Sequence, residues 1–321
     1  GAEVVYGDTD SLFVRLPGAS LEDAFTIGRR LCEGISAKHP APVELEFEKV
    51  YWPCLLLSKK RYAGVAYSKP PSEAGRPQFE AKGLEAVRRD HCRLTCQTQR
   101  ELLEELFRSK DLSAVKRLFT RRVSALLRGG ADGPGLTELV FHRETRLGTY
   151  RAEEEGAEGP ATLPPQAAVA YDRIAADGEG AGPEFGERVS YVVAVGPPGA
   201  RLVDRCVDPL ETLEGGNVKG RASSAAARVD RWHYVEKAVL PAVARILHED
   251  LVGLPPVDVQ SWLRQVPRPR AQGAVSGPLD RLLSARRACG SCGAPLPAAR
   301  SRAQCWTCAP LEELVAARQP A

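Results

Sequence analysis

The sequence lacks methionine altogether and has few aromatic residues, which make up 6% of its 321 positions. It also lacks any apolar run near the ~18 residues that a membrane-spanning helix requires, which excludes a transmembrane role. A strong excess of one charge is missing too, because 44 Lys and Arg residues oppose 41 Asp and Glu residues, for a net charge of +3. Any surface that binds anions must therefore be local.

The N-terminus shows neither a methionine nor the pattern of a secretory signal peptide. The residues 3–6 already have the apolar character of a strand, so the chain opens inside an expected secondary-structure element. We therefore expect that Gly1 is not the natural start, and that the sequence is the C-terminal part of something longer.

The overall composition is that of a folded protein. Hydrophobic residues make up 43% and charged residues 26%, which is too apolar for a wholly disordered chain. At ~150 residues per domain, the length suggests about two domains. Nine cysteines are present, and the five outside the cluster described below are scattered and odd in number. This pattern argues against a disulfide framework and favours a reducing compartment, the cytosol or the nucleus.

The first ninety residues predict an α+β arrangement with antiparallel strands. Apolar runs on both sides of residues 7–10 predict a β-hairpin with an acidic tip. A 3.6-residue apolar period predicts a helix over 20–36, for which Ser20 is a suitable N-cap. Alternating or apolar segments predict further strands at 43–48, 51–57 and 61–67.

Beyond about residue 93 the pattern is mainly helical. An apolar stripe predicts a helix over 112–127, which Asp111 caps at its start and two glycines end at 129–130. The segment 151–186 is rich in Gly, Ala, Glu and Pro, and we expect a loop or partly disordered insertion there. The remaining expected elements are a strand at 189–195, a helix at 235–247 that is kinked or interrupted at Pro241, and a linker near 265–280.

Asp8 and Asp10 are the first candidates for chemistry. A tight turn can bring two such carboxylates near one point, where they repel each other unless a cation offsets the charge. Mg²⁺ prefers hard oxygen ligands and leaves coordination positions open for phosphate oxygens. The alternative is that Asp-Thr-Asp is simply good turn chemistry. From these residues alone both interpretations stand.

Four cysteines form a second candidate site with the spacing Cys-x2-Cys-x12-Cys-x2-Cys. They are Cys289, Cys292, Cys305 and Cys308. Two such pairs suit tetrahedral Zn²⁺ with four thiolates, and a site without an open position is structural. Four thiolates could also hold an iron–sulfur cluster, or the four cysteines could be unrelated.

The stretch from Val5 to Ser11 resembles the third conserved palm motif of the family B DNA polymerases. In that family the motif presents carboxylates to two catalytic metal ions. The resemblance implies that Asp10 is the firmer metal ligand and Asp8 a weaker or outer one. It also implies two-metal phosphoryl transfer, in which metal ions ~3.5–4 Å apart serve a primer 3′-hydroxyl and the transferring phosphate.

Further segments carry the resemblance, among them residues 46–51. Residues 59–64 are similar to the family's Lys-x-Tyr element, which contacts the primer strand, and residues 82–90 are similar to the segment entering the thumb, which touches the duplex. The implied DNA-binding residues are Lys59, Lys60, Arg61, Tyr62, Lys82, Arg88 and Arg89. Clustered cations supply most sequence-independent affinity for phosphates, although any one cluster could equally be a solvated face.

Several other segments resemble the zeta branch of the family most, whose members extend primers past lesions, and the delta branch is the close competitor. They lie at 16–28, 207–211, 240–247 and 257–263. The resemblance covers nearly the whole chain and is weakest at 151–186 and 213–228. It implies a DNA-directed DNA polymerase in translesion synthesis. The alternatives are a replicative delta-type enzyme and a non-catalytic DNA-binding or scaffold module derived from a palm.

The resemblance also implies an architecture. We expect the C-terminal half of a palm, a mainly helical thumb with the insertion 151–186, a linker, and a small four-cysteine zinc ribbon with a tail. Their predicted bounds are 1–93, 94–264, 265–285 and 286–321. The family carries a second cysteine module that holds a [4Fe–4S] cluster, but its ligands are absent here.

The implied partners are primer–template DNA, dNTP, accessory polymerase subunits and a sliding clamp, in the nucleus and away from membranes. The sequence lacks segments matching the other palm carboxylate, the fingers helix and the exonuclease. We therefore expect these 321 residues alone not to polymerise.

Overall fold

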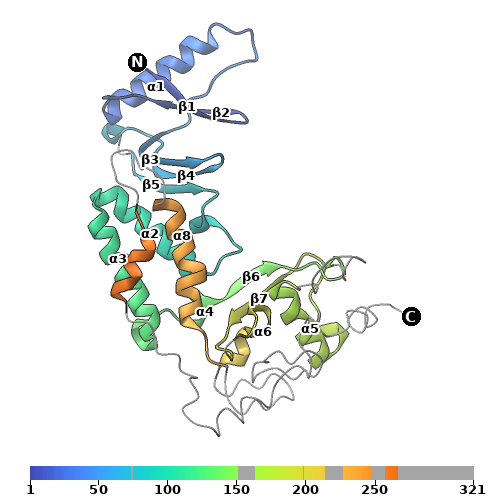
Figure 1. Ribbon diagram of the computed structural model, residues 1–321. Coiled ribbons are helices and arrows are strands. Elements are labelled where there is room, and N and C mark those ends of the chain that lie inside the picture. The colour runs from blue at the N-terminus through green and yellow to red at the C-terminus, as the bar shows by residue number, and fades with distance from the viewer. Residues whose placement is uncertain (74, 151–162, 198, 214–226, 248–256, 267–321) are drawn as a thin grey trace, which may run out of the picture. The chain divides into compact units, whose positions relative to one another are not determined.

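The computed structural model describes residues 1–73, 75–150, 163–197, 199–213, 227–247 and 257–266 (Figure 1). Helices and antiparallel strands are mixed, which confirms the α+β class. The chain divides into two compact units. Within the described residues, the first unit draws on residues 1–88, 97–119 and 242–259, and the second on residues 89–96, 120–241 and 260–266. The four candidate zinc ligands, Cys289, Cys292, Cys305 and Cys308, lie outside the described residues, as does the predicted linker beyond Val266.

The predicted acidic hairpin and the helix after it are both confirmed. Strand β1 (Glu3–Asp8) pairs antiparallel with β2 (Ser11–Arg15), in a register that places Asp8 opposite Ser11. Helix α1 (Leu21–Ser36) begins at a capping box. Ser20 Oγ accepts a hydrogen bond from the Asp23 amide at 3.1 Å, and the Asp23 carboxylate accepts one from the Ser20 amide at 3.2 Å. These bonds hold the pKa of Asp23 below its usual range.

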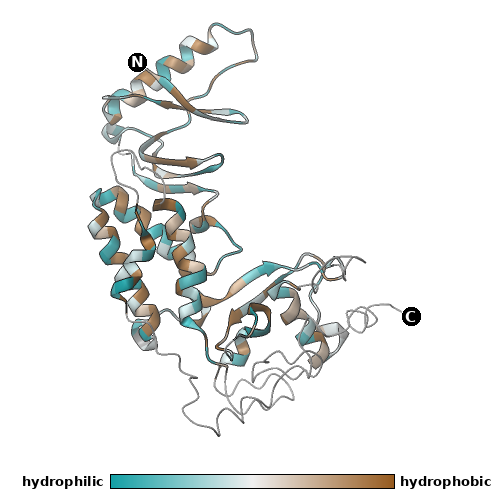
Figure 2. Cartoon of the chain, in the orientation of Figure 1, coloured by the Kyte–Doolittle hydropathy of each residue, from teal (hydrophilic) through white to brown (hydrophobic). Residues whose placement is uncertain are grey.

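A three-stranded antiparallel sheet follows, in the order β3–β4–β5. Its strands are β3 (Val50–Ser58), β4 (Arg61–Tyr67) and β5 (Gln78–Lys82). Two 3-10 turns flank β5, η1 (Pro71–Glu73) and η2 (Glu85–Val87). Figure 2 shows hydrophobic colour along much of β3. The strands predicted at 51–57 and 61–67 are confirmed as β3 and β4.

The strand predicted at 43–48 is wrong, because that segment has no regular secondary structure. Its alternation has another cause, which is contact with α1. The ring of Phe47 lies 5.6 Å from that of Phe25, and Ser36 Oγ accepts a hydrogen bond from the Leu45 amide at 2.7 Å. The segment is therefore held against a helix by the Phe47 ring and the Leu45 amide, and it pairs with no strand.

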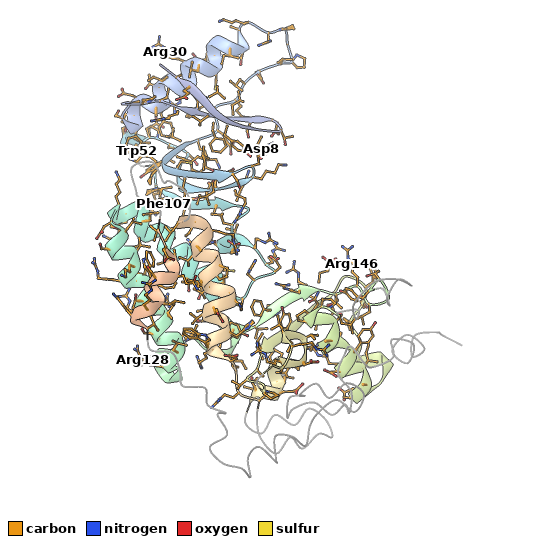
Figure 3. The ribbon with its side chains drawn as sticks, viewed as in Figure 1. Asp8, Arg30, Trp52, Phe107, Arg128 and Arg146 are labelled. Atoms are coloured by element: carbon orange, nitrogen blue, oxygen red, sulfur yellow. The ribbon has the colours of Figure 1, made fainter. Side chains whose placement is uncertain are left out.

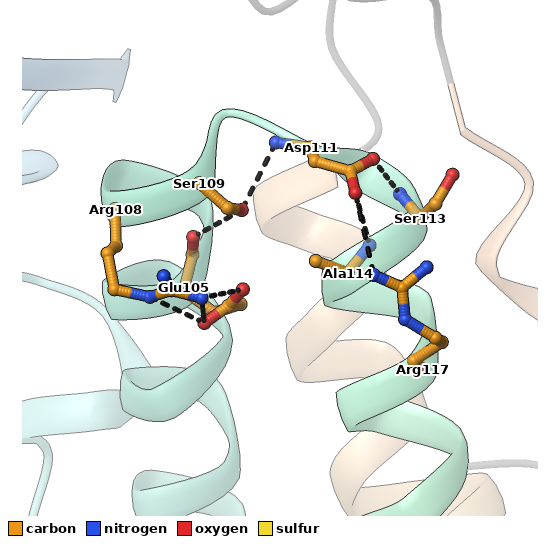
Figure 4. Close-up of polar contacts among 7 residues, drawn as sticks. All are labelled: Glu105, Arg108, Ser109, Asp111, Ser113, Ala114 and Arg117. Atoms are coloured by element: carbon orange, nitrogen blue, oxygen red, sulfur yellow. Dashed lines mark hydrogen bonds and ion pairs between the residues drawn. The ribbon is translucent and has the colours of Figure 1, made fainter.

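Helices α2 (Arg93–Ser109) and α3 (Leu112–Arg128) are joined by a tight turn, which Figure 4 shows. Asp111 caps α3 as predicted, because its carboxylate accepts hydrogen bonds from the amides of Ser113 at 2.8 Å and Ala114 at 3.2 Å. These bonds lower the pKa of Asp111. At the end of α2, Ser109 Oγ donates to the Glu105 carbonyl at 2.8 Å and accepts from the Asp111 amide at 3.2 Å.

The apolar stripe of α3 is buried as the sequence predicts, and Figure 2 shows its alternating colours. Its fully buried members are Val115, Phe119, Val123 and Leu126. The helix ends at Gly129, whose φ of 66° lies in the left-handed region that favours glycine.

The second unit contains another antiparallel sheet, in the order β6–β7–β8. Its strands are β6 (Phe141–Glu144), β7 (Arg188–Val193) and β8 (Cys206–Val207). The smaller elements around it are η3 (Gly130–Asp132), α4 (Leu136–Leu139), η4 (Glu179–Ala181), α6 (Leu202–Arg205) and η5 (Pro209–Thr212). The strand predicted at 189–195 is confirmed as β7.

The loop predicted over 151–186 is wrong in part, because α5 (Pro165–Asp177) forms within it. Residues 166–171 of this helix are buried, and the helix packs against β7. Three of its buried residues are alanines, whose small side chains allow close packing but resemble a low-complexity linker in composition. Residues 151–162 of the predicted insertion lie outside the described part.

The helix predicted at 235–247 changes its form just before Pro241. The chain runs from α7 (Arg231–His233) through a π-helical segment η6 (Tyr234–Val239) into α8 (Leu240–Leu247). The Leu240 amide donates to the Val235 carbonyl, five residues back, which is the wider π pattern. Proline has no amide hydrogen, so the irregular turn coincides with the residue that cannot continue the α pattern.

The last described elements are α9 (Val259–Trp262) and η7 (Leu263–Gln265). Among the described helices, none is both long enough and apolar enough to cross a membrane.

Candidate functional site

The acidic turn joins β1 to β2, and Figure 3 labels Asp8 at this hairpin. Thr9 adopts a left-handed φ of 52°, and the Asp10 amide donates to the Asp8 carbonyl at 2.6 Å. Ser11 Oγ donates to the same carbonyl at 3.2 Å, and Thr9 Oγ1 donates to Asp8 Oδ1 at 3.3 Å. The side chain of Asp8 is 24% exposed, whereas Asp10 is exposed. The turn thus presents one sheltered and one open carboxylate.

A basic turn, formed by Lys59 and Lys60 between β3 and β4, lies against this acidic turn. Lys60 Nζ is 3.6 Å from Asp8 Oδ1, and the Lys60 amide donates to the Tyr6 hydroxyl at 2.8 Å. Gly83 approaches the basic turn so closely that an added Cβ would lie 2.2 Å from the Lys60 carbonyl oxygen. The structure therefore brings together two hairpin tips that are about fifty residues apart in the sequence.

An aromatic cluster connects the acidic hairpin to the three-stranded sheet. The Phe13 ring centroid lies 5.5 Å from that of Tyr6, 5.8 Å from that of Tyr51 and 5.0 Å from that of Tyr62. Tyr62 is only 5% exposed, so its predicted role at the primer falls on a side chain that is largely packed. Lys82 Nζ lies 5.8 Å from the Tyr62 ring centroid, and interaction with Tyr62 raises the pKa of Lys82.

Glu80 on β5 holds Tyr51, a member of this cluster, in place. Its carboxylate accepts hydrogen bonds from the Tyr51 hydroxyl at 2.7 Å and from Lys49 Nζ at 3.0 Å. Burial alone would raise the pKa of Glu80, but these two donors outweigh it and leave the pKa below its usual range. Burial and the hydrogen bond to Glu80 both raise the pKa of Tyr51. Tyr51 therefore stays protonated, and its ring stays stacked on that of Phe13.

Glu85 is a buried carboxylate that the sequence analysis did not identify. It forms ion pairs inside the first unit. Its side chain is 7% exposed and lies 2.7 Å from Arg245 Nη2 and 3.8 Å from Arg61 Nη2. Gln99 Nε2 donates to Glu85 Oε2 at 2.7 Å and to the Ala242 carbonyl at 2.8 Å. Burial raises the pKa of Glu85, whereas Gln99 and Arg245 lower it, and the net result lies below the usual range. Arg61, predicted to bind DNA, is thus within reach of an internal carboxylate.

The remaining predicted DNA-binding residues are Lys59, Arg88 and Arg89. Lys59 and Arg88 are exposed in the first unit. Arg89 belongs to the second unit, where its carbonyl accepts a hydrogen bond from Arg188 at 2.9 Å. Of the predicted site, the structure therefore places Asp8 and Asp10 in the acidic turn and Lys59 and Lys60 in the basic turn, with Lys60 in contact with Asp8.

The acidic turn offers a suitable but partial set of metal ligands. Carboxylate oxygens suit Mg²⁺, which takes six ligands, some of them water or phosphate oxygens. Over the ranges that the structure describes, no three His, Cys, Asp or Glu side chains gather as a metal site. The ammonium of Lys60 beside Asp8 shows that this carboxylate already attracts a cation. The acidic turn therefore supplies ligand atoms of the kind that Mg²⁺ prefers, and a metal site at Asp8 and Asp10 stays a prediction.

Comparison with known proteins gives a consistent result. The family model described as DNA polymerase family B matches residues 1–249. The chain is 38% identical over 279 residues to the DNA polymerase zeta catalytic subunit of Arabidopsis thaliana, covering 87% of this chain and 14% of that protein. It is 38% identical over 268 residues to the human zeta catalytic subunit, covering 84% of this chain and 8% of that protein.

Similarity to the delta branch is weaker. The chain is 33% identical over 252 residues to the DNA polymerase delta catalytic subunit of Bos taurus, covering 78% of this chain and 20% of that protein. The chain thus spans between 8% and 20% of the length of these relatives.

Proposed function

The chain belongs to the family B DNA polymerases, and from this we propose that it forms part of a zeta-like enzyme that extends a primer along a template. The observation that carries the proposal is the meeting of the two turns, with Lys60 Nζ 3.6 Å from Asp8 Oδ1. A carboxylate and an ammonium group at facing hairpin tips suit a reaction in which metal ions and phosphate groups bind close to each other, because the carboxylate can bind the metal and the ammonium the phosphate. The greater identity to zeta than to delta subunits favours translesion synthesis.

The chemistry follows from the charges of the reactants. The primer 3′-oxygen attacks the α-phosphorus of the incoming dNTP, the bond to the bridging oxygen breaks, and pyrophosphate and one proton leave. Asp8 and Asp10 would hold magnesium, which, when bound, favours the ionised 3′-hydroxyl and offsets charge on the phosphates. Lys60 and Lys82 would neutralise phosphates of the primer strand, because ammonium groups contribute sequence-independent affinity.

The direct test is primer extension by the full-length protein on a primed template with dNTPs. We expect elongation and release of pyrophosphate. Tight DNA binding with no elongation under any metal condition would instead favour the non-catalytic scaffold, which the facing carboxylates and lysine argue against. Bypass of an abasic site would separate a zeta-type enzyme from a delta-type one, which should stall.

The Lys60→Ala variant tests the contact of the basic turn with DNA. The plot of log K against log salt has a negative slope, and removing one phosphate contact should make it shallower by about 0.9, because fewer counterions are released. Affinity for primer–template should fall at low salt and change less at high salt. The measurement is fluorescence anisotropy across a salt series.

Lys38→Ala is the matched control, since Lys38 is also an exposed lysine of the first unit. It should leave the salt slope unchanged. Equal slopes for Lys60→Ala and the unmutated protein would show that Lys60 does not contact a phosphate.

We also propose that the cysteine quartet holds a structural Zn²⁺ ion, because its spacing and four soft donors suit that ion. Protein purified under reducing conditions should carry about one zinc for this quartet. Cys305→Ser should release it, whereas Cys54→Ser, a change at an exposed thiol outside the quartet, should not. Metal analysis checks this, and iron with labile sulfide in place of zinc would contradict it.

Nuclear location, accessory subunits and a sliding clamp are part of the same proposal. They rest on similarity to the zeta and delta catalytic subunits, which implies work on DNA.

A further inference from the structure

The basic turn has a backbone donor that the β-ladder does not use. Strands β3 and β4 pair through Ser58 opposite Arg61, which leaves Lys60 within the turn itself. Lys60 adopts a left-handed φ of 59°, a conformation that a non-glycine residue holds only when its surroundings favour it. Its amide finds an acceptor in the Tyr6 hydroxyl, 2.8 Å away and 54 residues earlier in the chain.

The Tyr6 hydroxyl is itself aimed by packing. The Tyr6 ring lies against Phe13, which stacks on Tyr51 with ring centroids 5.8 Å apart and an interplanar angle of 13°. Tyr51 is fixed in turn by its hydrogen bond to Glu80. The aromatic cluster therefore fixes the Tyr6 hydroxyl relative to the three-stranded sheet.

We propose that Tyr6 is a positioning residue, whose hydroxyl sets the basic turn against the acidic turn and so holds the Lys60 ammonium beside Asp8. Tyr6 acts through the backbone of Lys60 and need not touch substrate. Its consequence for primer extension rests on the proposed function, whereas the hydrogen bond can be tested without it.

The first test is amide hydrogen exchange in the full-length protein with Tyr6→Phe, which removes one oxygen and keeps the packed ring. Exchange of the Lys60 amide, followed in peptides that cover the basic turn, should become about fivefold faster. The matched control is Tyr150→Phe, because the Tyr150 hydroxyl accepts a hydrogen bond from the Arg146 amide at 3.0 Å in the second unit. That variant should speed exchange at Arg146 and leave Lys60 unchanged.

The second test is steady-state primer extension by the same variants. Tyr6→Phe should raise KM for primer–template about threefold and change kcat less, because a misplaced Lys60 weakens DNA binding. A merely structural role would instead lower the active fraction, and with it kcat, at constant KM.

The outcomes separate the two claims. Unchanged exchange at Lys60 in Tyr6→Phe, or an unchanged KM despite faster exchange, would overturn the positioning role. Faster exchange in a protein that never extends primers would support the contact and remove the proposed function.

Discussion

Replacing Asp10 with alanine in the full-length protein is expected to lower primer extension about a thousandfold while leaving primer–template binding nearly unchanged. A ligand to a catalytic metal ion supports several kcal/mol of transition-state stabilisation, and ~4 kcal/mol corresponds to about three powers of ten. Asp10 is exposed at the tip of the acidic turn, so its removal leaves the hairpin register and the aromatic cluster in place.

The measurement is single-turnover primer extension with a parallel DNA-binding titration. Asp177→Ala is the control, since Asp177 is an exposed carboxylate at the end of α5, in the second unit. It should extend primers at the unmutated rate. Extension by Asp10→Ala within about tenfold of the unmutated protein would show that this carboxylate is not a metal ligand, and the scaffold interpretation would gain.

The elements that could be predicted from sequence are those with short-range causes. The acidic hairpin follows from two apolar runs around a four-residue tip, and α1 and α3 follow from a capping side chain at the start of an apolar stripe. In each case the residues that define the element lie within a few positions of one another. Periodicity and capping chemistry report such neighbours directly.

The elements that were missed depend on what a segment packs against. Alternation at 43–48 is equally suited to a strand and to an extended segment lying on α1, and only the Phe25–Phe47 contact distinguishes them. The alanine-rich helix α5 has a weak period because burial on several sides needs no polar face. Neither partner is visible in the local sequence.

The same limit applies to the site. Motif similarity selected Asp8, Asp10 and Lys60. It could not show that Lys60 contacts Asp8, because the two residues are about fifty positions apart in the sequence. Similarity also could not show that Tyr62 is packed or that Arg61 lies near Glu85. Glu85 itself had no local signal, because its partner Arg245 lies 160 residues away.

That long-range pair leads to the largest expected effect on stability. Arg245→Met should lower the free energy of unfolding of the first unit by about 2–3 kcal/mol at neutral pH, because it leaves the buried Glu85 carboxylate without its main counter-ion. The expected loss is smaller than the ~3–5 kcal/mol usual for breaking a buried ion pair, for two reasons. The Arg245 side chain is 40% exposed, and Arg61 remains 3.8 Å from Glu85.

The matched control is Arg108→Met on helix α2, which removes an arginine with a 73% exposed side chain from its pair with Glu105. It should change stability little, because solvent screens a pair whose cation is exposed. The measurement is hydrogen exchange of the α2 amides in both variants. Similar losses of protection would show that Glu85 is not held by Arg245.

The pH dependence gives an independent check on the same pair. The pKa of Glu85 is below its usual range when folded, so its contribution to stability is present above the unfolded pKa, near 4.5, and is lost as pH falls through the folded pKa. In Arg245→Met that pKa rises, because Gln99 and Arg61 then oppose the effect of burial without Arg245. The difference in stability between the two proteins should therefore shrink as pH falls through the raised folded pKa of the variant, where Glu85 becomes protonated in the variant first. A difference that stays constant down to acid pH would assign the loss to the packing of the Arg245 side chain instead of to its charge.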